Sequence, residues 1–398
     1  MYREDFPMLS KDIVYFDNGA TTFKPKEVLD KMNEYYNNYT ANAHRGDYDI
    51  SLEVDKRYEE VRTKVKNLIN ADSPSEIVFT NGTTDSLNRI AFGFFKNILK
   101  KDDEILITES EHASNILPWF VLEKDLGIKV KYIPLDQNNE VTIQNVKNSI
   151  TDKTKLISLA HITNVIGDLR PIKEIGMLAH ERNIYFVIDA AQSIAHSKID
   201  VQSSYIDFLA FSAHKVYGPT GVGVMYGRKE LLEKMLPLSY GGGMNASFTK
   251  DGDYILKELP LRLEAGTPNI AGVIGLGSAI DYLNKIGLDN IINYEHELQR
   301  YLLKRLEEVP NIIIYNKNTS GSIVAFNIKD IFSQDTSLYL NKYHICVRAG
   351  NHCAKILKDV LKTGNTCRIS LAFYNNKEEI DLLINVLLNN SNIWKEIL

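Results

Sequence analysis

The stretch from Ile184 to Lys215, IYFVIDAAQSIAHSKIDVQSSYIDFLAFSAHK, contains two apolar runs that each end in titratable side chains. The first run is followed by Asp189, and the second, within 207–215, leads to His214 and Lys215. Apolar runs without polar alternation are typical of strands that are covered on both faces, as in parallel sheets. Because ligands bind beyond the carboxyl ends of such strands, this stretch predicts a buried sheet with a ligand site along one edge.

Three further apolar runs, at 76–80, 104–110 and 155–162, alternate with helical patterns before that stretch. This order predicts βαβ units and a mostly parallel sheet, so we expect an α/β fold. After about residue 285 the pattern changes to short strands and a closing helical pattern, which predicts a second, smaller α/β domain. The expected ranges are 16–285 for the large domain and 286–398 for the small C-terminal domain, with 1–15 packing against the latter.

The composition favours a globular protein and gives no support for a nucleic-acid or membrane partner. The chain has 398 residues, 44% of them hydrophobic, and a net charge of −5. No signal-like N-terminal segment and no apolar run long enough to span a bilayer is visible, so we expect a cytoplasmic protein. The three cysteines, Cys346, Cys353 and Cys367, form no CxxC pair. We therefore expect reduced thiols and no metal site.

Polar or titratable side chains follow all five predicted strands of the large sheet. In chain order they are Thr83 and Thr84 with Asp85, His112 after Glu111, Asn164 after Thr163, Asp189 with Gln192, and Ser212 with His214 and Lys215. Since parallel strands place their carboxyl ends at one edge of a sheet, we expect these groups to meet there.

Each of these residues has an ordinary structural explanation as well as a functional one. Lys215 alone fits a surface lysine, Asp189 fits a structural hydrogen bond, and Thr83 or Thr84 fits a helix N-cap. A partly desolvated lysine, however, can form a Schiff base with a carbonyl cofactor, and a buried aspartate can keep a pyridinium nitrogen protonated. Threonine hydroxyls and free N–H groups at a helix N-terminus bind phosphate.

Two more residues complete a set that fits one cofactor. His112 fits either a solvated surface position or a ring that stacks on a planar ligand. Arg368 lies in the apolar run TCRISLAFYN, where its charge needs a carboxylate from the protein or from a substrate. The sequence contains neither a P-loop nor a dinucleotide fingerprint. Together these residues describe a site for pyridoxal 5′-phosphate (PLP) and an amino acid.

Motifs along nearly the whole chain carry a family resemblance. They run from YFDNGATTFKP (15–25) through HRGDY, NGTTDSLN, EHASNILPW, AHITNVIG, IDAAQS, FSAHKVYGPTG, YGGGM, EAGTPN and RAGNHCA to CRISLAFYN. In these motifs the sequence resembles the PLP-dependent cysteine desulfurases of the SufS/CsdA type, which belong to the class V aminotransferase family. The resemblance implies the PLP-dependent transferase fold of type I.

The resemblance also implies a role for each candidate residue. Lys215 would bind PLP covalently, Asp189 would pair with the pyridine nitrogen, Gln192 would bind the ring hydroxyl and His112 would stack on the ring. Thr83, Thr84, Ser212 and His214 would hold the phosphate, Asn164 would lie near ring and substrate, and Arg368 would bind the substrate carboxylate. Thr267 would reach the phosphate of a neighbouring subunit, which implies a homodimer.

Cys353 would accept the substrate sulfur on the short polar loop RAGNHCA. Three basic neighbours, Arg348, His352 and Lys355, are expected to favour its thiolate form, whereas Cys346 and Cys367 lie in apolar runs that suit inert thiols. Two positions depart from the family pattern. They are Asn351, where the family often has histidine, and Ala213, where it has glycine.

The expected reaction is the conversion of L-cysteine to L-alanine, with the sulfur passing as a persulfide on Cys353 to an acceptor protein for iron–sulfur cluster assembly. The acceptor is expected to be of the SufE or SufU kind. Three alternatives remain open at this point: selenocysteine lyase activity on the same scaffold, a related aminotransferase or kynureninase-like activity, and a PLP-binding scaffold without catalysis. The retention of Lys215, Asp189, Arg368 and Cys353 together disfavours the last.

Overall fold

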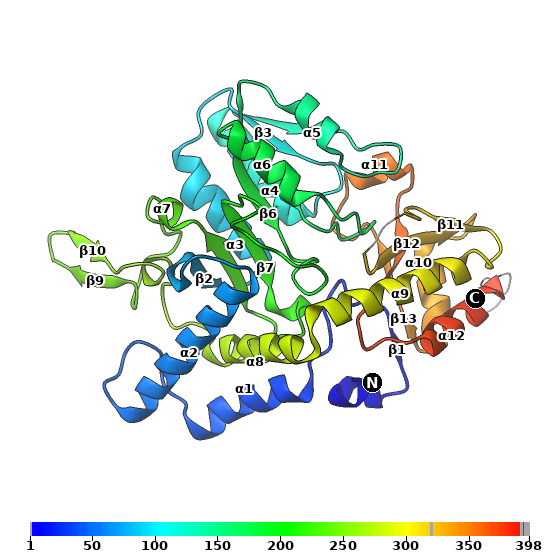
Figure 1. Ribbon diagram of the computed structural model, residues 1–398, viewed down its shortest axis with the longest axis horizontal. Coiled ribbons are helices and arrows are strands. Elements are labelled where there is room, and N and C mark those ends of the chain that lie inside the picture. The colour runs from blue at the N-terminus through cyan, green and yellow to red at the C-terminus, as the bar shows by residue number, and fades with distance from the viewer. Residues whose placement is uncertain (1, 319–320, 391–392, 394–398) are drawn as a thin grey trace.

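The computed structural model describes residues 2–318, 321–390 and 393, and it shows two α/β parts built on separate sheets (Figure 1). Met1 and residues 319–320, 391–392 and 394–398 of the two predicted domain ranges lie outside the described residues. Among the described residues, no helix is long and apolar enough to cross a membrane.

The larger part is built on a seven-stranded sheet with the strand order β2-β8-β7-β6-β5-β3-β4. The strands are β2 (Ile77–Thr80), β3 (Glu104–Ile107), β4 (Lys129–Tyr132), β5 (Thr154–Ala160), β6 (Tyr185–Asp189), β7 (Phe208–Ser212) and β8 (Gly223–Gly227). Only β8 pairs antiparallel with its neighbours in this sheet, β2 and β7. The remaining pairs are parallel, which confirms the predicted mostly parallel sheet.

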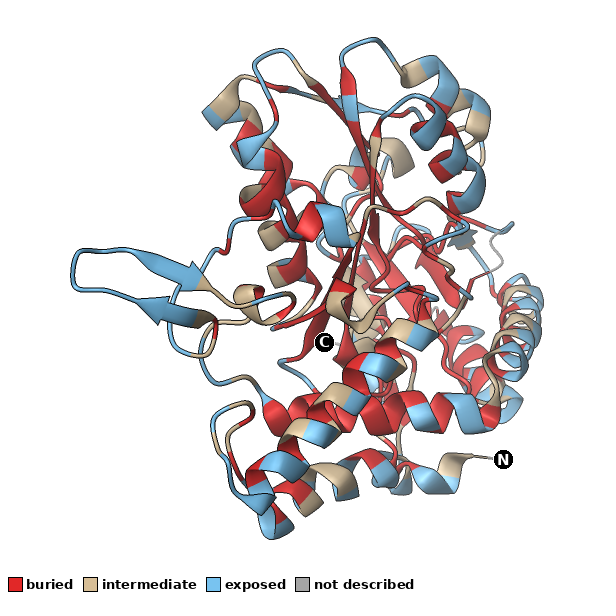
Figure 2. Cartoon of the chain, turned by 60° about the vertical axis from the view of Figure 1, so that its left-hand side comes forward, coloured by how far each residue is buried: buried red, intermediate tan, exposed pale blue. Residues whose placement is uncertain are grey.

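Helices cover both faces of this sheet, as its uninterrupted apolar strands require. One face packs against α1 (Lys26–Asn38), α2 (Asp49–Leu68), α5 (Ile143–Ser149), α6 (Ile172–Glu181) and α8 (Ile270–Ile286). The other face packs against α3 (Thr83–Arg89), α4 (Leu117–Leu126) and α7 (Lys229–Leu232). Figure 2 shows the buried residues of the sheet and of the helix faces that cover it as one continuous interior.

The smaller part has an antiparallel sheet with the order β11-β12-β15-β14 and its own apolar core. Its strands are β11 (Ile312–Ile314), β12 (Ile323–Ile328), β14 (Arg348–Gly350) and β15 (Thr366–Ser370). The helices of this part are α9 (Leu288–Leu306), α10 (Ser333–Asn341), α11 (Leu357–Leu361) and α12 (Lys377–Leu387). The predicted closing helix thus ends at Leu387.

The N-terminal segment contacts both parts. Its strand β1 (Val14–Tyr15) pairs in parallel with β13 (Ile345–Cys346), next to the small sheet. Phe6 instead packs against Tyr217 and Tyr282 of the large core and against Phe373 and Tyr374.

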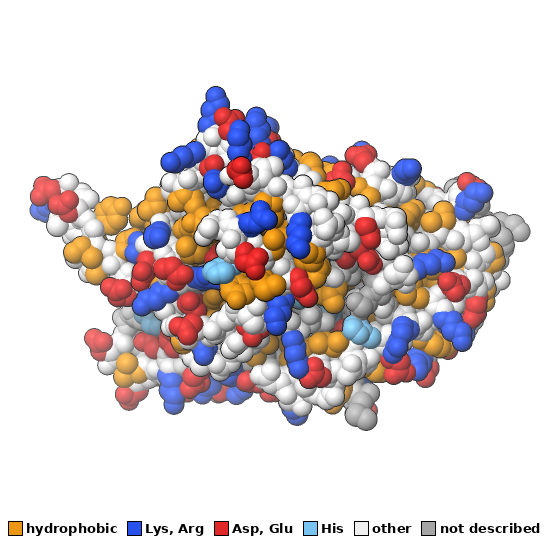
Figure 3. Space-filling model, turned by 45° about the horizontal axis from the view of Figure 1, so that its top comes forward, with side chains coloured by type: hydrophobic (Ala, Val, Ile, Leu, Met, Phe, Trp, Pro, Cys, Tyr) orange, Lys and Arg blue, Asp and Glu red, His pale blue; other side chains and the backbone are white. Residues whose placement is uncertain are grey.

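The surface carries both acidic and basic side chains, and a hairpin projects from it. On the face drawn in Figure 3, basic and acidic side chains are intermixed over most of the surface. The hairpin of β9 (Asn245–Phe248) and β10 (Tyr254–Leu256) extends away from the rest of the chain (Figure 2). Its Phe248, Tyr254 and Ile255 are exposed.

Candidate active site

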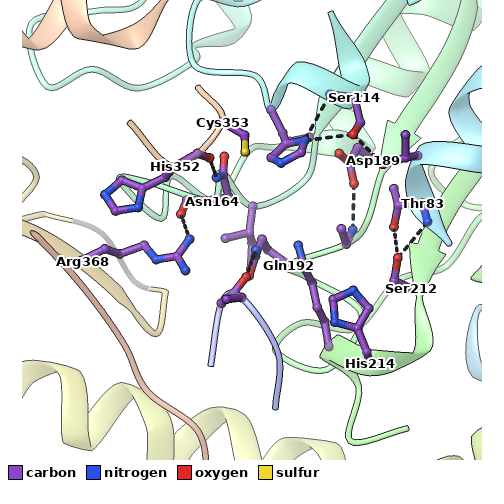
Figure 4. Close-up of a pocket in the computed structure, with 18 of the residues that line it drawn as sticks. Thr83, Ser114, Asn164, Asp189, Gln192, Ser212, His214, His352, Cys353 and Arg368 are labelled. Atoms are coloured by element: carbon purple, nitrogen blue, oxygen red, sulfur yellow. Dashed lines mark hydrogen bonds between the residues drawn. The ribbon is translucent and has the colours of Figure 1, made fainter. Parts of the chain in front are cut away.

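The polar ends of the five predicted strands meet at one cavity of about 230 Å³, together with the cysteine loop of the small sheet (Figure 4). Eleven of the predicted site residues line it: Thr83, Thr84, His112, Asn164, Asp189, Gln192, Ser212, His214, Lys215, Cys353 and Arg368. The sequence-based expectation that these groups lie together is therefore met. Thr267 lies elsewhere.

Lys215 lies in a 3₁₀ turn directly after β7, at the edge of the sheet. Burial lowers the pKa of Lys215 to about 8, although the nearby Asp189 carboxylate opposes this effect. Within the described chain, no hydrogen bond or ion pair involves its Nζ atom. The side chain is thus a partly desolvated amine that is available for bonding inside the cavity.

Asp189 is the last residue of β6 and is buried. Its Oδ1 accepts a hydrogen bond from the Ala191 backbone N–H at 2.9 Å. Burial raises the pKa of Asp189 to about 6, because the charged carboxylate is poorly solvated there. A cationic ring nitrogen in the cavity would therefore stabilise the charged form of this carboxylate.

His112 is held as a neutral ring with a defined tautomer. Its Nδ1 accepts the Ser114 backbone N–H at 3.1 Å, so the proton of the neutral ring is on Nε2. Burial and the neighbouring Lys215 lower the pKa of His112 to about 4. The Ser114 hydroxyl lies 3.1 Å from the same Nδ1 and 2.7 Å from the Thr84 hydroxyl. This network fixes the ring beside the cavity.

Hydroxyl groups cluster where β2 turns into α3. Ser212 Oγ accepts the Thr83 backbone N–H at 2.8 Å and lies 2.7 Å from Thr83 Oγ1. The turn needs glycine, because Gly82 has a φ of +150° and a Cβ on Gly223 would lie 2.3 Å from the Gly82 Cα. Donors and hydroxyls at this turn fit an oxyanion such as a phosphate.

Arg368, Asn164 and Gln192 connect the cavity wall to the rest of the structure. The Arg368 guanidinium is 1% exposed, and its Nη1 donates to the Asn164 carbonyl at 2.9 Å. The Asn164 side-chain amide in turn donates to the His352 carbonyl at 2.7 Å. Gln192 Nε2 donates to the Gly19 carbonyl at 2.8 Å. Arg368 thus presents a buried positive charge to the cavity.

The cysteine loop has an unusual backbone. Gly350, His352 and Cys353 have φ values of 135°, 51° and 60°, and the latter two are non-glycine residues in the left-handed region. The Cys353 carbonyl accepts the Ala113 N–H at 2.8 Å, and its own N–H donates to Asn351 Oδ1 at 3.1 Å. Asn351, which departs from the family pattern, therefore stabilises the turn that presents the exposed thiol.

The expectation that His352 contributes a positive charge beside Cys353 is wrong. Burial lowers the pKa of His352 to about 3, with Arg368 acting in the same direction. Its Nε2 contacts the Thr366 carbonyl and hydroxyl, both at 3.0 Å. In Figure 4 its ring lies on the far side of the loop from the Cys353 sulfur. The sequence alone did not reveal this burial.

The three cysteines differ as their sequence settings predict. Cys353 is exposed and lines the cavity, Cys346 is half-buried and Cys367 is buried. Burial raises the pKa of the Cys367 thiol to about 12, and its Sγ donates to the Ser333 carbonyl at 3.1 Å. Among the three, only Cys353 joins the residues around Lys215.

Thr267 lines a separate cavity of about 130 Å³ on the other side of the β2–α3 turn. There Thr267 is exposed, and its hydroxyl accepts a hydrogen bond from Asn42 Nδ2 at 3.2 Å. Arg45 and Arg89 line the same cavity. Thr267 is not among the described residues that line the first cavity.

Sequence reasoning missed the buried charges beneath His112. Glu111 and Arg170 are fully buried and form an ion pair, and Asp168 lies 3.3 Å from Arg170 Nε. Glu111 also accepts hydrogen bonds from Asn115 and from the Ala160 N–H, both at 2.8 Å. Glu111 follows a strand in EHASNILPW, but nothing in the sequence identified Arg170 as its partner.

The sequence matches the aminotransferase class-V family over residues 14–383. The chain belongs to this family. Because aminotransferases of class V depend on PLP, the match also confirms the cofactor predicted from the sequence. A probable cysteine desulfurase of Halalkalibacterium halodurans is 43% identical over 383 residues, covering 95% of this chain and 94% of that protein. A cysteine desulfurase of Wigglesworthia glossinidia brevipalpis is 40% identical over 97% of this chain and 96% of that protein.

Solved structures agree with this assignment. The apo cysteine desulfurase of Thermococcus onnurineus NA1 has a TM-score of 0.93 and 37% identity, covering 98% of this chain and 96% of that one. The cysteine desulfurase CsdA of Escherichia coli has a TM-score of 0.92 and 34% identity, covering 99% and 98%. The predicted family and the predicted fold class are confirmed.

Proposed function

We propose that this protein converts L-cysteine to L-alanine and carries the released sulfur as a persulfide on Cys353. The observation that supports it most is the presence of an exposed thiol in the same cavity as Lys215, Asp189 and Arg368. Amino-group transfer needs no thiol nucleophile, whereas an enzyme that accepts sulfur needs one in its active site. Here the thiol of Cys353 is presented by a backbone in the left-handed region.

The residues of the cavity fit PLP. Lys215 has an unpartnered amine for the aldehyde, Asp189 has a carboxylate for the ring nitrogen, and hydroxyls of Thr83 and Ser212 offer a place for the phosphate. We assign Thr84 and His214 to the phosphate, Gln192 to the ring hydroxyl and His112 to the ring face. When bound, PLP supplies an electron-accepting ring that makes the Cα proton and the Cβ–sulfur bond of an amino acid labile.

The protein residues then have separate tasks. Arg368 binds the substrate carboxylate, and Asn164 holds Arg368 against the cysteine loop. Lys215, whose pKa is about 8, moves the Cα proton at neutral pH. His112 keeps its proton on Nε2, where it can donate a hydrogen bond into the cavity.

Cys353 supplies the nucleophile. Its sulfur forms a bond to the substrate sulfur, while the Cβ–sulfur bond breaks and its electron pair stays on carbon. Protonation of that carbon, together with return of a proton from Lys215 to Cα, gives L-alanine, and the thiol of Cys353 has become a persulfide. L-cysteine loses one sulfur atom and Cys353 gains it, so no external oxidant is needed.

We further propose a homodimer in which Thr267 of each chain reaches the phosphate bound by its partner. The exposed position of Thr267, away from the first cavity, supports this. Mixing Lys215→Ala chains with Thr267→Ala chains should restore activity, because the mixed dimer contains one intact site. Unchanged activity despite confirmed subunit exchange would contradict shared sites.

The remaining assignments concern context. We propose a cytoplasmic protein with the large domain over 16–285 and the small domain over 286–398, with 1–15 beside the small domain. The separate apolar core of the small sheet, which includes Val14 of the N-terminal segment, supports this division. The persulfide would pass to an acceptor protein of the SufE or SufU kind, for iron–sulfur cluster assembly.

The deciding experiment measures alanine release from L-cysteine, with and without a thiol acceptor, by the parent protein and by Lys215→Ala. We expect release by the parent that rises with the thiol, and none by Lys215→Ala. If the parent protein binds PLP but releases no alanine, the proposed reaction is excluded and a PLP-binding scaffold without catalysis is favoured. If alanine is released faster from selenocysteine than from L-cysteine, and this release persists in Cys353→Ala, selenocysteine lyase activity is favoured.

A further inference from the structure

The Arg368 guanidinium is joined to a carboxylate that comes from the opposite end of the sequence. Arg368 Nη2 lies 2.7 Å from Asp17 Oδ1. Arg368 lines the cavity, whereas Asp17 is not among the described residues that do so. Asp17 therefore contacts the guanidinium from outside the cavity and does not occupy the space that a ligand would take.

The Asp17 carboxylate offsets the unfavourable burial of the Arg368 charge. Burial lowers the pKa of Arg368, and the nearby Arg348 acts in the same direction. Arg348 stands directly opposite Arg368 in the β14–β15 pairing, where like charges destabilise each other. Asp17 is the only carboxylate within ion-pair distance of Arg368 among the described residues, and it opposes both effects.

The backbone around Asp17 is fixed to the strand that carries Arg368. Asp17 forms a parallel bridge with Ser370, at the end of β15. The Ser370 N–H donates to the Phe16 carbonyl at 2.7 Å, and the Gly19 N–H donates to Ser370 Oγ at 2.7 Å. The backbone before and after Asp17 is thus fixed to the strand that carries Arg368, and this places the Asp17 carboxylate beside the guanidinium.

Two anchors then define the plane of the guanidinium. Asp17 holds Nη2, and the Asn164 carbonyl accepts from Nη1 at 2.9 Å. The Nε atom is buried without a partner in the described structure. A buried donor without a partner is costly, so a ligand that accepts from this guanidinium would recover that energy.

We propose that Asp17 is the positioning residue for Arg368, and that it sets how strongly the site binds the substrate's α-carboxylate. Its negative charge stabilises the buried Arg368 charge beside Arg348, and its oxygen holds the guanidinium with the remaining N–H groups free for a carboxylate. This inference deepens the proposed function and rests on it for the identity of the substrate.

The test compares a substrate that has the carboxylate charge with one that lacks it. KM and kcat are measured for L-cysteine and for L-cysteine methyl ester with the parent, Asp17→Asn and the control Asp289→Asn, whose ion pair with Lys198 is exposed. We expect Asp17→Asn to raise KM for L-cysteine about tenfold or more, with kcat changed less than about threefold. In Asp17→Asn, KM and kcat for the ester should stay near the values of the parent. In Asp289→Asn, KM and kcat should stay near the parent values for both substrates.

An unchanged or lower KM for L-cysteine in Asp17→Asn would overturn the inference, as would an equal loss with the ester. Asp17→Glu keeps the charge and should retain more of the affinity for L-cysteine than Asp17→Asn. If Asp17→Asn does not fold, Asp17→Ala, which also removes the carboxylate, takes its place: a KM raised for L-cysteine alone supports the role of Asp17, and no change with either substrate overturns it.

A binding measurement separates this inference from the proposed reaction. Equilibrium binding of L-cysteine and of its methyl ester is followed by PLP absorbance in a Cys353→Ala background, where sulfur transfer is blocked. We expect the Asp17→Asn change to weaken binding of L-cysteine selectively. This outcome stands even if the parent releases no alanine, in which case only the proposed reaction fails.

Discussion

The two sides of the cavity are built in opposite ways. On the strand-end side, Glu111 and Arg170 are fully buried and their charges are paired and hydrogen-bonded. On the other side, Cys353 is exposed on a left-handed backbone and is held by few hydrogen bonds. A buried, paired network provides a fixed frame, whereas an exposed loop leaves one thiol open both to the cavity and to solvent. Changes to the frame should therefore cost stability, and changes to the loop should cost chemistry.

The largest effect is expected from removing the thiol. Cys353→Ala should lower the rate of alanine release from L-cysteine by about 10³-fold or more, because no nucleophile remains to take the sulfur. The variant should still bind PLP and fold like the parent, since the Cys353 side chain is exposed. Release at nearly the parent rate would show that the loop does not carry the chemistry.

The other cysteines provide matched controls for that result. Cys346→Ala and Cys367→Ala should keep most of the activity, because neither thiol lines the cavity. Cys367→Ala should cost about 1 kcal/mol of unfolding free energy through lost packing. A large loss of activity in a folded Cys367→Ala protein would contradict the proposal that Cys353 alone takes part in the reaction.

The frame is tested by Glu111→Gln, which leaves the buried charge of Arg170 without its main partner. The free energy of unfolding should fall by about 3–5 kcal/mol, as for other buried pairs that lose one member. Denaturant unfolding of the parent and the variant measures this difference. Glu297→Gln, which removes an exposed pair with Lys377, is the control and should change little. Equal stability of Glu111→Gln and the parent would show that the frame does not depend on this pair.

The sequence predicted the frame's position but not its internal support. Apolar runs ending in polar residues gave the sheet and the residues at its edge, because strand period and strand-end chemistry are local properties. The pairing of Glu111 with Arg170 and of Asp17 with Arg368 joins distant segments, and no local pattern specifies such contacts. The neutral, buried state of His352 was missed for the same reason, since its burial depends on how the small sheet meets the cavity wall.

A pH-dependent effect is expected where the larger part of the fold meets helix α9 of the smaller part. His196 Nδ1 lies 2.6 Å from Glu295 on α9. Burial disfavours the imidazolium, but Glu295 outweighs it and the pKa of His196 is raised above 6.5. The pair's contribution to stability is therefore fully present below about pH 6.5 and lost as the pH rises through the folded-state pKa.

Unfolding free energies of the parent and of His196→Gln, measured across this pH range, test the pair. The difference between the two proteins should shrink as the pH rises, because the parent loses the contribution that the variant lacks. A difference that stays constant with pH would contradict a charged pair at this junction.

The smallest effect is expected from Asn351→Ala. The side chain accepts one exposed hydrogen bond from the Cys353 N–H at 3.1 Å, so its loss should cost about 0.5–1 kcal/mol of unfolding free energy. Thermal unfolding measures this cost, and the rate of alanine release should fall because the turn that presents the thiol is less well defined. A stability loss as large as that of Glu111→Gln would mean that the loop also belongs to the frame.

Mass spectrometry of the protein, after it has reacted with L-cysteine in the absence of a thiol acceptor, tests directly whether Cys353 carries the sulfur. We expect the peptide containing Cys353 to gain the mass of one sulfur atom and to lose it again when a thiol is added, while the Cys346 and Cys367 peptides stay unchanged. Alanine release without any added sulfur on Cys353, or sulfur on Cys346 or Cys367 instead, would contradict this role of Cys353.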